Sequence, residues 1–238
     1  MSKGLASELG AALSANGIEM HSQPDTQTVT MPLRGTEVEV PRIHPAWQLY
    51  EGSGKVAGIP NKNRVAGPAI VDRHVPEIAV ARMAEAATGA DAWWTIWNPS
   101  DATIRGVPGS ADPGRERPIP FPELIAQILG TVAQKTREIV GACEKRWEET
   151  GEEWRADAEG RTKRPMGGGI WDVVISNGVV PLKFIECKRK EGSDTLKDNQ
   201  RAFLEALISR ADTKKQWRHL VCIVDWHAPG ERVQEEQP

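Results

Sequence analysis

The sequence predicts a mixed α/β domain in which helices flank a central sheet. Short apolar and β-branched runs, such as residues 93–97 and 219–226, have the composition of buried strands. Other segments, above all residues 124–147, carry apolar side chains at helical spacing. The chain has 238 residues, which is enough for one large domain with a substantial appendage.

The composition favours a soluble protein. Hydrophobic residues make up 39% and charged residues 26%, and no run approaches the ~20 apolar residues that span a bilayer. The N-terminus lacks a signal-peptide pattern, so we expect a cytoplasmic protein with no membrane partner. Cys143, Cys187 and Cys222 show no metal-ligand spacing and are interpreted as isolated thiols. The formal net charge of -3 excludes a grip on nucleic acid by the whole surface.

Residues 1–75 are predicted to form an N-terminal arm that is partly extended. An amphipathic stretch over residues 5–16 precedes a segment rich in proline, which disfavours helix. Apolar alternation over residues 28–40 suits edge strands, and a flexible tail or a partner-binding arm fits equally well.

Residues 76–230 are predicted to form the main domain. Pro76 and Glu77 suit a helix start, and apolar spacing continues to about Thr88. The run Trp93–Trp97 is typical of a strand and is closed by Asn98-Pro99.

Residues 100–165 are predicted to be an insertion in this domain. Residues 100–122 are rich in proline, glycine and arginine and should be a loop. A long helix should follow from Leu124 to Trp147, with one apolar face that could also serve a homodimer. The polar residues 148–164 should leave the core.

The C-terminal part alternates strand and helix. We predict a strand over residues 170–175, a turn at Asn177-Gly178, a second strand over 179–188, a helix over 198–210 and a last strand over 219–226. Residues 231–238 are assigned to a tail.

The candidate chemistry lies on the two strands of this predicted hairpin. Side chains alternate along a strand, so Glu186 and Lys188 should project from one face while Ile185 and Cys187 face the other. With Asp172 from the preceding strand, the site would offer hard oxygen ligands for Mg²⁺ or Mn²⁺ and an amine able to orient a water. Phosphodiester hydrolysis needs this combination.

These residues resemble the PD-(D/E)XK nuclease superfamily, which has a restriction-endonuclease-like fold, and in particular its VRR-NUC-like members. The resemblance covers Gly167 to Trp226 and rests on the Gly-x-x-Asp, Glu-x-Lys and downstream Gln pattern, although Trp171 stands where the family has proline. It implies a Mg²⁺- or Mn²⁺-dependent nuclease that acts on DNA as an endonuclease.

The resemblance also implies roles for individual residues. Asp172 and Glu186 would bind the metal with the Cys187 carbonyl as a further ligand, and Lys188 would position the attacking water. Gln200 on the following helix would reach back toward the site. A glutamate on an earlier helix would complete it, and Glu77 is chosen over Glu85 and Glu123.

The register of the hairpin tests this interpretation. A plain two-residue turn at 177–178 would place Asp172 opposite Lys183, on the wrong face. One extra residue, in a bulge or a longer loop, would pair Asp172 with Phe184, on the face of Glu186. We therefore predict a break in the ladder near residues 180–182.

Local positive charge surrounds the predicted site despite the negative total. Lys190, Lys197 and Arg201 are the candidate contacts to nucleic acid. The nine tryptophans are assigned to core packing rather than base stacking, and the five histidines to structural roles. The alternatives are a nuclease-like module that binds DNA or protein without cutting, and a nuclease that acts on RNA. The form of the substrate stays open.

Overall fold

The structure is a computed structural model. It describes residues 4–15, 18–46, 77, 80–97, 104–108, 119–151, 169–178, 181–189, 195–210 and 213–226.

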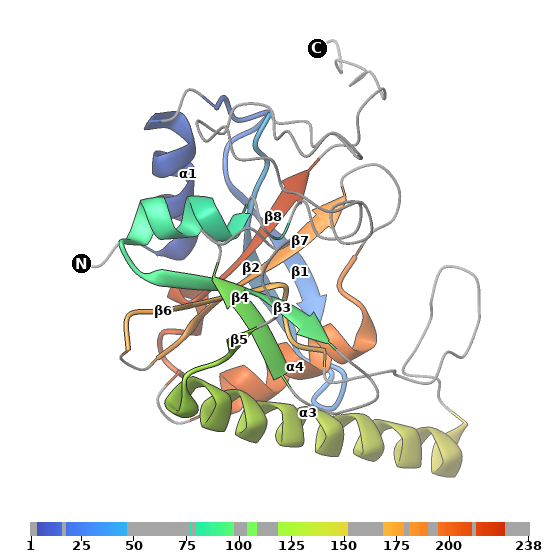
Figure 1. The fold of residues 1–238 in the computed structure, drawn as a ribbon. Coiled ribbons are helices and arrows are strands. Elements are labelled where there is room, and N and C mark those ends of the chain that lie inside the picture. The colour runs from blue at the N-terminus through green and yellow to red at the C-terminus, as the bar shows by residue number, and fades with distance from the viewer. Residues whose placement is uncertain are drawn as a thin grey trace, which may run out of the picture.

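A single mixed sheet forms the centre of the described chain (Figure 1). Its strands are β1 (Asp25–Thr30), β2 (Glu37–Ile43), β3 (Asp91–Trp97), β4 (Ile104–Pro108), β5 (Ile119–Pro120), β6 (Val173–Ser176), β7 (Lys183–Arg189) and β8 (Val221–Trp226). Their order in the sheet is β1-β2-β8-β7-β6-β3-β4-β5. The neighbours β2, β8 and β7 run parallel, and the other pairs are antiparallel. The predicted mixed α/β class is confirmed.

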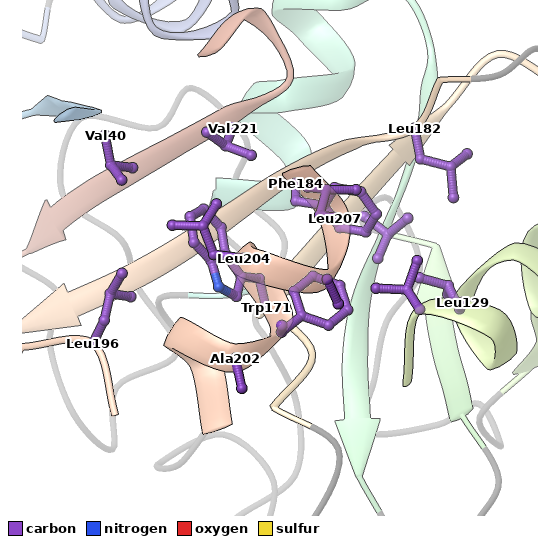
Figure 2. Packing of buried hydrophobic residues seen from close by; sticks show 14 of the residues in the cluster. Val40, Leu129, Trp171, Leu182, Phe184, Leu196, Ala202, Leu204, Leu207 and Val221 are labelled. Atoms are coloured by element: carbon purple, nitrogen blue, oxygen red, sulfur yellow. The ribbon is translucent and has the colours of Figure 1, made fainter. Parts of the chain in front are cut away.

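Helices cover both faces of the sheet. Helix α1 (Leu5–Ala15) and a helix over residues 80–88 bury their apolar side chains against one face. Helices α3 (Glu123–Thr150) and α4 (Asp198–Ser209) cover the other. Figure 2 shows this second core, in which Trp171, Phe184 and Leu204 lie together. A short 3₁₀ helix, η1 (Trp217–His219), leads into β8. Within the described residues no helix is both long and apolar enough to cross a membrane.

The described N-terminal residues belong to the main core. Strands β1 and β2 form a hairpin that extends the sheet beyond β8, as the edge-strand interpretation of residues 28–40 predicted. Leu5, Leu9 and Leu13 of α1 are fully buried against the sheet. Residues 4–46 are therefore not a separate arm, because their apolar side chains complete one face of the central sheet.

Two predictions about the insertion need correction. The predicted loop over 100–122 contains the short strands β4 and β5, because β4 pairs with the edge of β3 and β5 pairs with β4. The long helix is confirmed, but its buried stripe starts at Ile125 rather than Leu124. Leu124 is 49% exposed, since it lies about 100° from Ile125 around the helix, and Trp147 in the last turn is 38% exposed.

The pairing of β6 with β7 differs by two residues from the predicted pairing, but Asp172 still lies on the predicted face of the sheet. Val173 pairs with Ile185 and Ile175 with Lys183, so the connecting loop is longer than two residues and the ladder stops before Leu182. Continuing this register by one residue places Asp172 opposite Glu186, not opposite Phe184. Because these positions differ by two residues, Asp172 still reaches the face of Glu186.

Candidate active site

The alternation of β7 sends Glu186 and Lys188 toward α4. Ile185 and Cys187 pack in the core beneath α1, whereas Phe184 packs in the core beneath α4. The predicted division of side chains between the two faces is therefore confirmed. Glu186 is only 1% exposed and Lys188 only 2%, so both charged groups are buried. The Lys188 Nζ lies 2.9 Å from the Glu186 Oε1. Burial of two charged groups is tolerated only when they are in direct contact with each other.

Gln200 joins α4 to this ion pair. Its side-chain nitrogen donates a hydrogen bond to the Glu186 Oε1, and its Oε1 accepts one from the Lys188 Nζ at 3.0 Å. The same Oε1 accepts the backbone N–H of Lys197 at 2.9 Å, which is one half of a capping box at the start of α4. One amide therefore both begins the helix and contacts the two charged groups of β7.

Asp172 lies beside the same strand. Its Oδ2 accepts the backbone N–H of Cys187 at 2.8 Å, although the two residues are fifteen apart in sequence. Its backbone carbonyl accepts the N–H of Thr95 in β3 at 2.7 Å. The Asp172 carboxylate is thus held at the strand that carries Glu186 and Lys188, as the site requires.

Of the three candidate glutamates, Glu77 is electrostatically coupled to the site. The pKa of Glu77 is raised to about 8, mainly by burial and in part by the Glu186 carboxylate, against the opposing effects of a backbone hydrogen bond and of Lys188. Glu85 instead accepts the N–H of Ala92 at 3.3 Å, and Glu123 is exposed at the start of α3. The choice of Glu77 over Glu85 and Glu123 stays a prediction.

Burial dominates the electrostatics of Glu186. It raises the pKa of this carboxyl to about 8, and the Asp172 charge adds to the rise, against the opposing effects of Lys188 and of a backbone hydrogen bond from Asp172. The Cys187 thiol lies on the opposite face, and burial raises its pKa well above the usual range. Only the main chain of Cys187 is left as a candidate metal ligand.

Two of the residues predicted to contact nucleic acid, Lys197 and Arg201, differ in their exposure and in their contacts. Lys197 is exposed just before α4. Arg201 is partly buried and forms an ion pair with Asp198 one turn away, so its guanidinium is already engaged within the helix. Lys190 lies outside the described residues.

The site residues fit a hard divalent cation that is bound by only a few protein ligands. Among the described residues, no group of three or more His, Cys, Asp or Glu side chains could hold a metal ion. Two carboxylates remain, those of Asp172 and Glu186, and Mg²⁺ is commonly held by one or two carboxylates with water completing its shell. The Glu186 Oε2 is buried and has no hydrogen-bond partner in the described part of the chain. A buried carboxylate oxygen of this kind suits an ion as its partner.

A second polar cluster, absent from the sequence predictions, lies at the carboxyl ends of β2 and β8. Asp225 is fully buried and accepts hydrogen bonds from the Arg42 guanidinium at 2.7–3.1 Å. His44 Nδ1 lies 2.5 Å from the Asp225 Oδ2, so this histidine belongs to a buried polar network. The signal in the sequence is Arg42-x-His44 at the end of a strand, the same spacing as Glu186-x-Lys188.

No family model, no curated protein and no solved structure matches this chain. The mixed α/β fold and the geometry of Asp172, Glu186, Lys188 and Gln200 are therefore the basis for any functional conclusion.

Proposed function

We propose that this protein is a metal-dependent nuclease that hydrolyses DNA phosphodiester bonds. The observation that carries the proposal is the buried contact of Glu186, Lys188 and Gln200, from two elements, beside the Asp172 carboxylate. A structural ion pair between Glu186 and Lys188 would not need the carboxylate of Asp172 beside it. Strongly perturbed, clustered titratable groups are typical of functional sites.

The order of elements supports a restriction-endonuclease-like core. Apart from β4, β5 and α3, which lie between β3 and β6 in the chain, the helix over 80–88 is followed by β3, β6 and β7 as an antiparallel series, and α4 then leads to β8 parallel to β7. This helix, strand, strand, strand, helix, strand order agrees with the resemblance found in the motif. Strands β1, β2, β4 and β5 would then be additions at the two sheet edges.

Each residue has a separate task in the proposed reaction. Asp172 and Glu186 would hold Mg²⁺ or Mn²⁺, which when bound polarises a phosphoryl oxygen and offsets negative charge in the transition state. Lys188, held by Glu186 and Gln200, would orient the attacking water and take part in its deprotonation. Gln200 keeps the ammonium and the carboxylate in one geometry, and Glu77 adds a nearby acid.

The decisive experiment compares two lysines of one strand. We expect the wild-type protein to cut DNA with Mg²⁺ or Mn²⁺ and not with EDTA, and Lys188→Ala to slow cutting by about 10²–10⁴-fold, as removal of a proton-transfer group does. Lys183→Ala is the matched control, because the Lys183 Nζ binds Glu8 of α1 at 2.7 Å, on the other face of β7. Equal cutting by the two variants would remove Lys188 from the mechanism.

Two further arms separate the alternatives. Matched DNA and RNA substrates distinguish a deoxyribonuclease from a nuclease that acts on RNA. In a thermal melt, a metal-binding site predicts that Mn²⁺ raises the midpoint of the wild-type protein, since a ligand that binds only the folded state stabilises it. A module that binds DNA without cutting would keep its affinity and show no Mn²⁺ shift, and this result would overturn the proposal.

A further inference from the structure

The cluster of Arg42, His44 and Asp225 ends in an exposed carboxylate. His44 Nε2 lies 2.8 Å from the Oδ1 of Asp25, whose side chain is 57% exposed, while His44 itself is buried. Both ring nitrogens therefore face carboxylates, which only accept hydrogen bonds, and the doubly protonated imidazolium satisfies both contacts. The hydrogen bond to Asp225 raises the pKa of His44 against the effect of its burial, and Asp25 adds to the rise.

This cluster lies in the same row of the sheet as Lys188. Asp225 is the ladder partner of Lys188, and the pairing of Ile43 with Val224 places His44 beside Asp225. Strands β2, β8 and β7 are parallel and adjacent, so their carboxyl ends meet at one edge of the sheet (Figure 1). Two strand spacings, about 9.6 Å, separate the backbones of β2 and β7.

The side chains of this cluster carry a net positive charge that is available to an anionic ligand. Arg42 and His44 share the single buried carboxylate of Asp225, so these three side chains together carry one positive charge. Asp25 neutralises that charge from the solvent side, and because the Asp25 side chain is exposed, water or another anion can compete for its contact with His44. Lys188 is the charged neighbour on the far side of Asp225.

We propose that His44, held by Asp225, forms a second phosphate position, which binds a backbone phosphate of the nucleic acid next to the one being cut, in place of Asp25. This inference rests on the proposed function, because the phosphate at Lys188 is what brings a neighbouring phosphate to this row. The imidazolium Nε2–H donates to the phosphate oxygen, and Asp25 competes for the same donor when no nucleic acid is bound.

Removal of the competitor tests the proposal. DNA binding is measured by fluorescence anisotropy with a labelled oligonucleotide at pH 6 in EDTA, so that no cutting occurs. Asp25→Asn should bind about three- to fivefold more tightly than the wild-type protein, which is the size of one exposed charge pair. The gain should shrink at high salt, where exposed charges are screened.

Glu37→Gln is the matched control. Glu37 is exposed on the same hairpin but at its other end, opposite Thr30, whereas Asp25 is opposite Arg42. It removes the same charge about 16 Å away along the strand, so it reports the general effect of a more positive protein. An equal gain in both variants overturns the proposal.

The pH dependence supplies a second readout. His44 must be protonated to donate from Nε2 while it binds Asp225, so DNA affinity should fall as the pH rises through its raised pKa, above the ordinary 6.5. His44→Gln should weaken binding at pH 6 and remove that part of the pH dependence. An unchanged profile in this variant, with its fold intact by circular dichroism, overturns the proposal.

The two proposals fail in different ways. If the wild-type protein cuts DNA and Lys188→Ala does not, while Asp25→Asn matches Glu37→Gln in affinity, the second phosphate position is wrong and the nuclease stands. If no preparation cuts DNA but Asp25→Asn alone binds it more tightly, the phosphate position stands in a protein that binds without cutting.

Discussion

The environment of Glu186 opposes its charge. Burial and the Asp172 carboxylate raise its pKa to about 8, and the Lys188 ammonium at 2.9 Å only partly compensates. In the unfolded chain the same group titrates near 4.5. Between these two pH values the folded protein binds a proton that the unfolded chain releases, so this group makes folding less favourable as the pH rises.

Glu186→Gln should therefore stabilise the metal-free protein at high pH. For a single such group the free energy of unfolding falls by about 1.4 kcal/mol per pH unit between the two pKa values. The variant lacks this loss, so its advantage in EDTA should grow from pH 5 to pH 8. Glu77 titrates in both proteins, but in the variant it lacks the part of its pKa rise that comes from the Glu186 charge, and this difference acts in the same direction. Urea unfolding at several pH values measures the effect.

The same variant should lose its response to metal. Mn²⁺ should raise the melting midpoint of the wild-type protein and leave that of Glu186→Gln almost unchanged, because an amide oxygen is a weaker ligand than a carboxylate. Glu37→Gln, a substitution of the same type at an exposed site, should keep the wild-type behaviour in both measurements. Parallel pH slopes for all three proteins would contradict this account of Glu186.

Short-range spacing explains which site residues the sequence could predict. Glu186 and Lys188 are two residues apart on one strand, so alternation alone placed them on one face. The ladder partner of Asp172 depends on the length of the loop between β6 and β7. Because this loop is longer than predicted, the partner is Glu186 rather than Phe184, which lies on the same face of β7. The contact of His44 with Asp225 spans 181 residues, and no local pattern predicts which distant strands become neighbours.

At the scale of elements, the start of α4 is held against the segment that leads into β6. The Trp171 indole N–H donates to the Gln200 carbonyl at 3.3 Å, and Trp171 is completely buried. Gly169 has a φ of +61°, and a Cβ there would lie 2.0 Å from the Asn199 carbonyl oxygen. A side chain at residue 169 would have to displace the backbone beside Gln200.

Gly169→Ala should therefore reduce cutting through the position of Gln200. We expect a loss of activity of about tenfold or more, because misplacement of a site by about 1 Å costs up to about 100-fold. Gly178→Ala is the control: its φ of +83° imposes similar backbone strain, but nothing lies within 4 Å of a Cβ there. Both variants should lose about 1–2 kcal/mol of stability from strain, and Gly178→Ala should keep its activity. Equal activities would show that the contact between Gly169 and the start of α4 does not position the site.

Elements whose own residues have a strong apolar pattern could be predicted from the sequence. Elements that form only by pairing with a neighbouring strand could not. Helix α3 carries several turns of apolar spacing, and β3 carries a compact aromatic run, so both agree with the sequence prediction. Strand β5 has only two residues, and β4 lies in a stretch rich in proline and glycine. They are strands because β4 pairs with the edge of β3 and β5 with the edge of β4, and a local pattern cannot reveal these neighbours.

At the scale of the whole molecule, the N-terminal helix and hairpin complete both candidate sites from outside the motif. Strand β2 brings Arg42 and His44 to Asp225, next to Lys188 in the ladder. Helix α1 packs on β8 and β2 and shares a core with Ile185 and Cys187 of β7. The sequence prediction of an arm missed this because prolines in residues 24–76 indicate irregular backbone but not where that backbone docks.

A cavity in α1 should therefore destabilise the entire described domain and not only its N-terminus. Leu9 is 1% exposed in the core that also holds Val224 of β8, so Leu9→Ala should lower the free energy of unfolding by about 2–5 kcal/mol. Leu33→Ala is the matched control, since Leu33 is 37% exposed and its truncation should cost about 0.5 kcal/mol or less.

Far-ultraviolet circular dichroism and tryptophan fluorescence should report one coincident transition in each protein. An early, separate loss of helix in Leu9→Ala, with the fluorescence transition unmoved, would mean that α1 is an independent attachment after all. In that case β2 would hold His44 beside Asp225 without help from the helix packed on it.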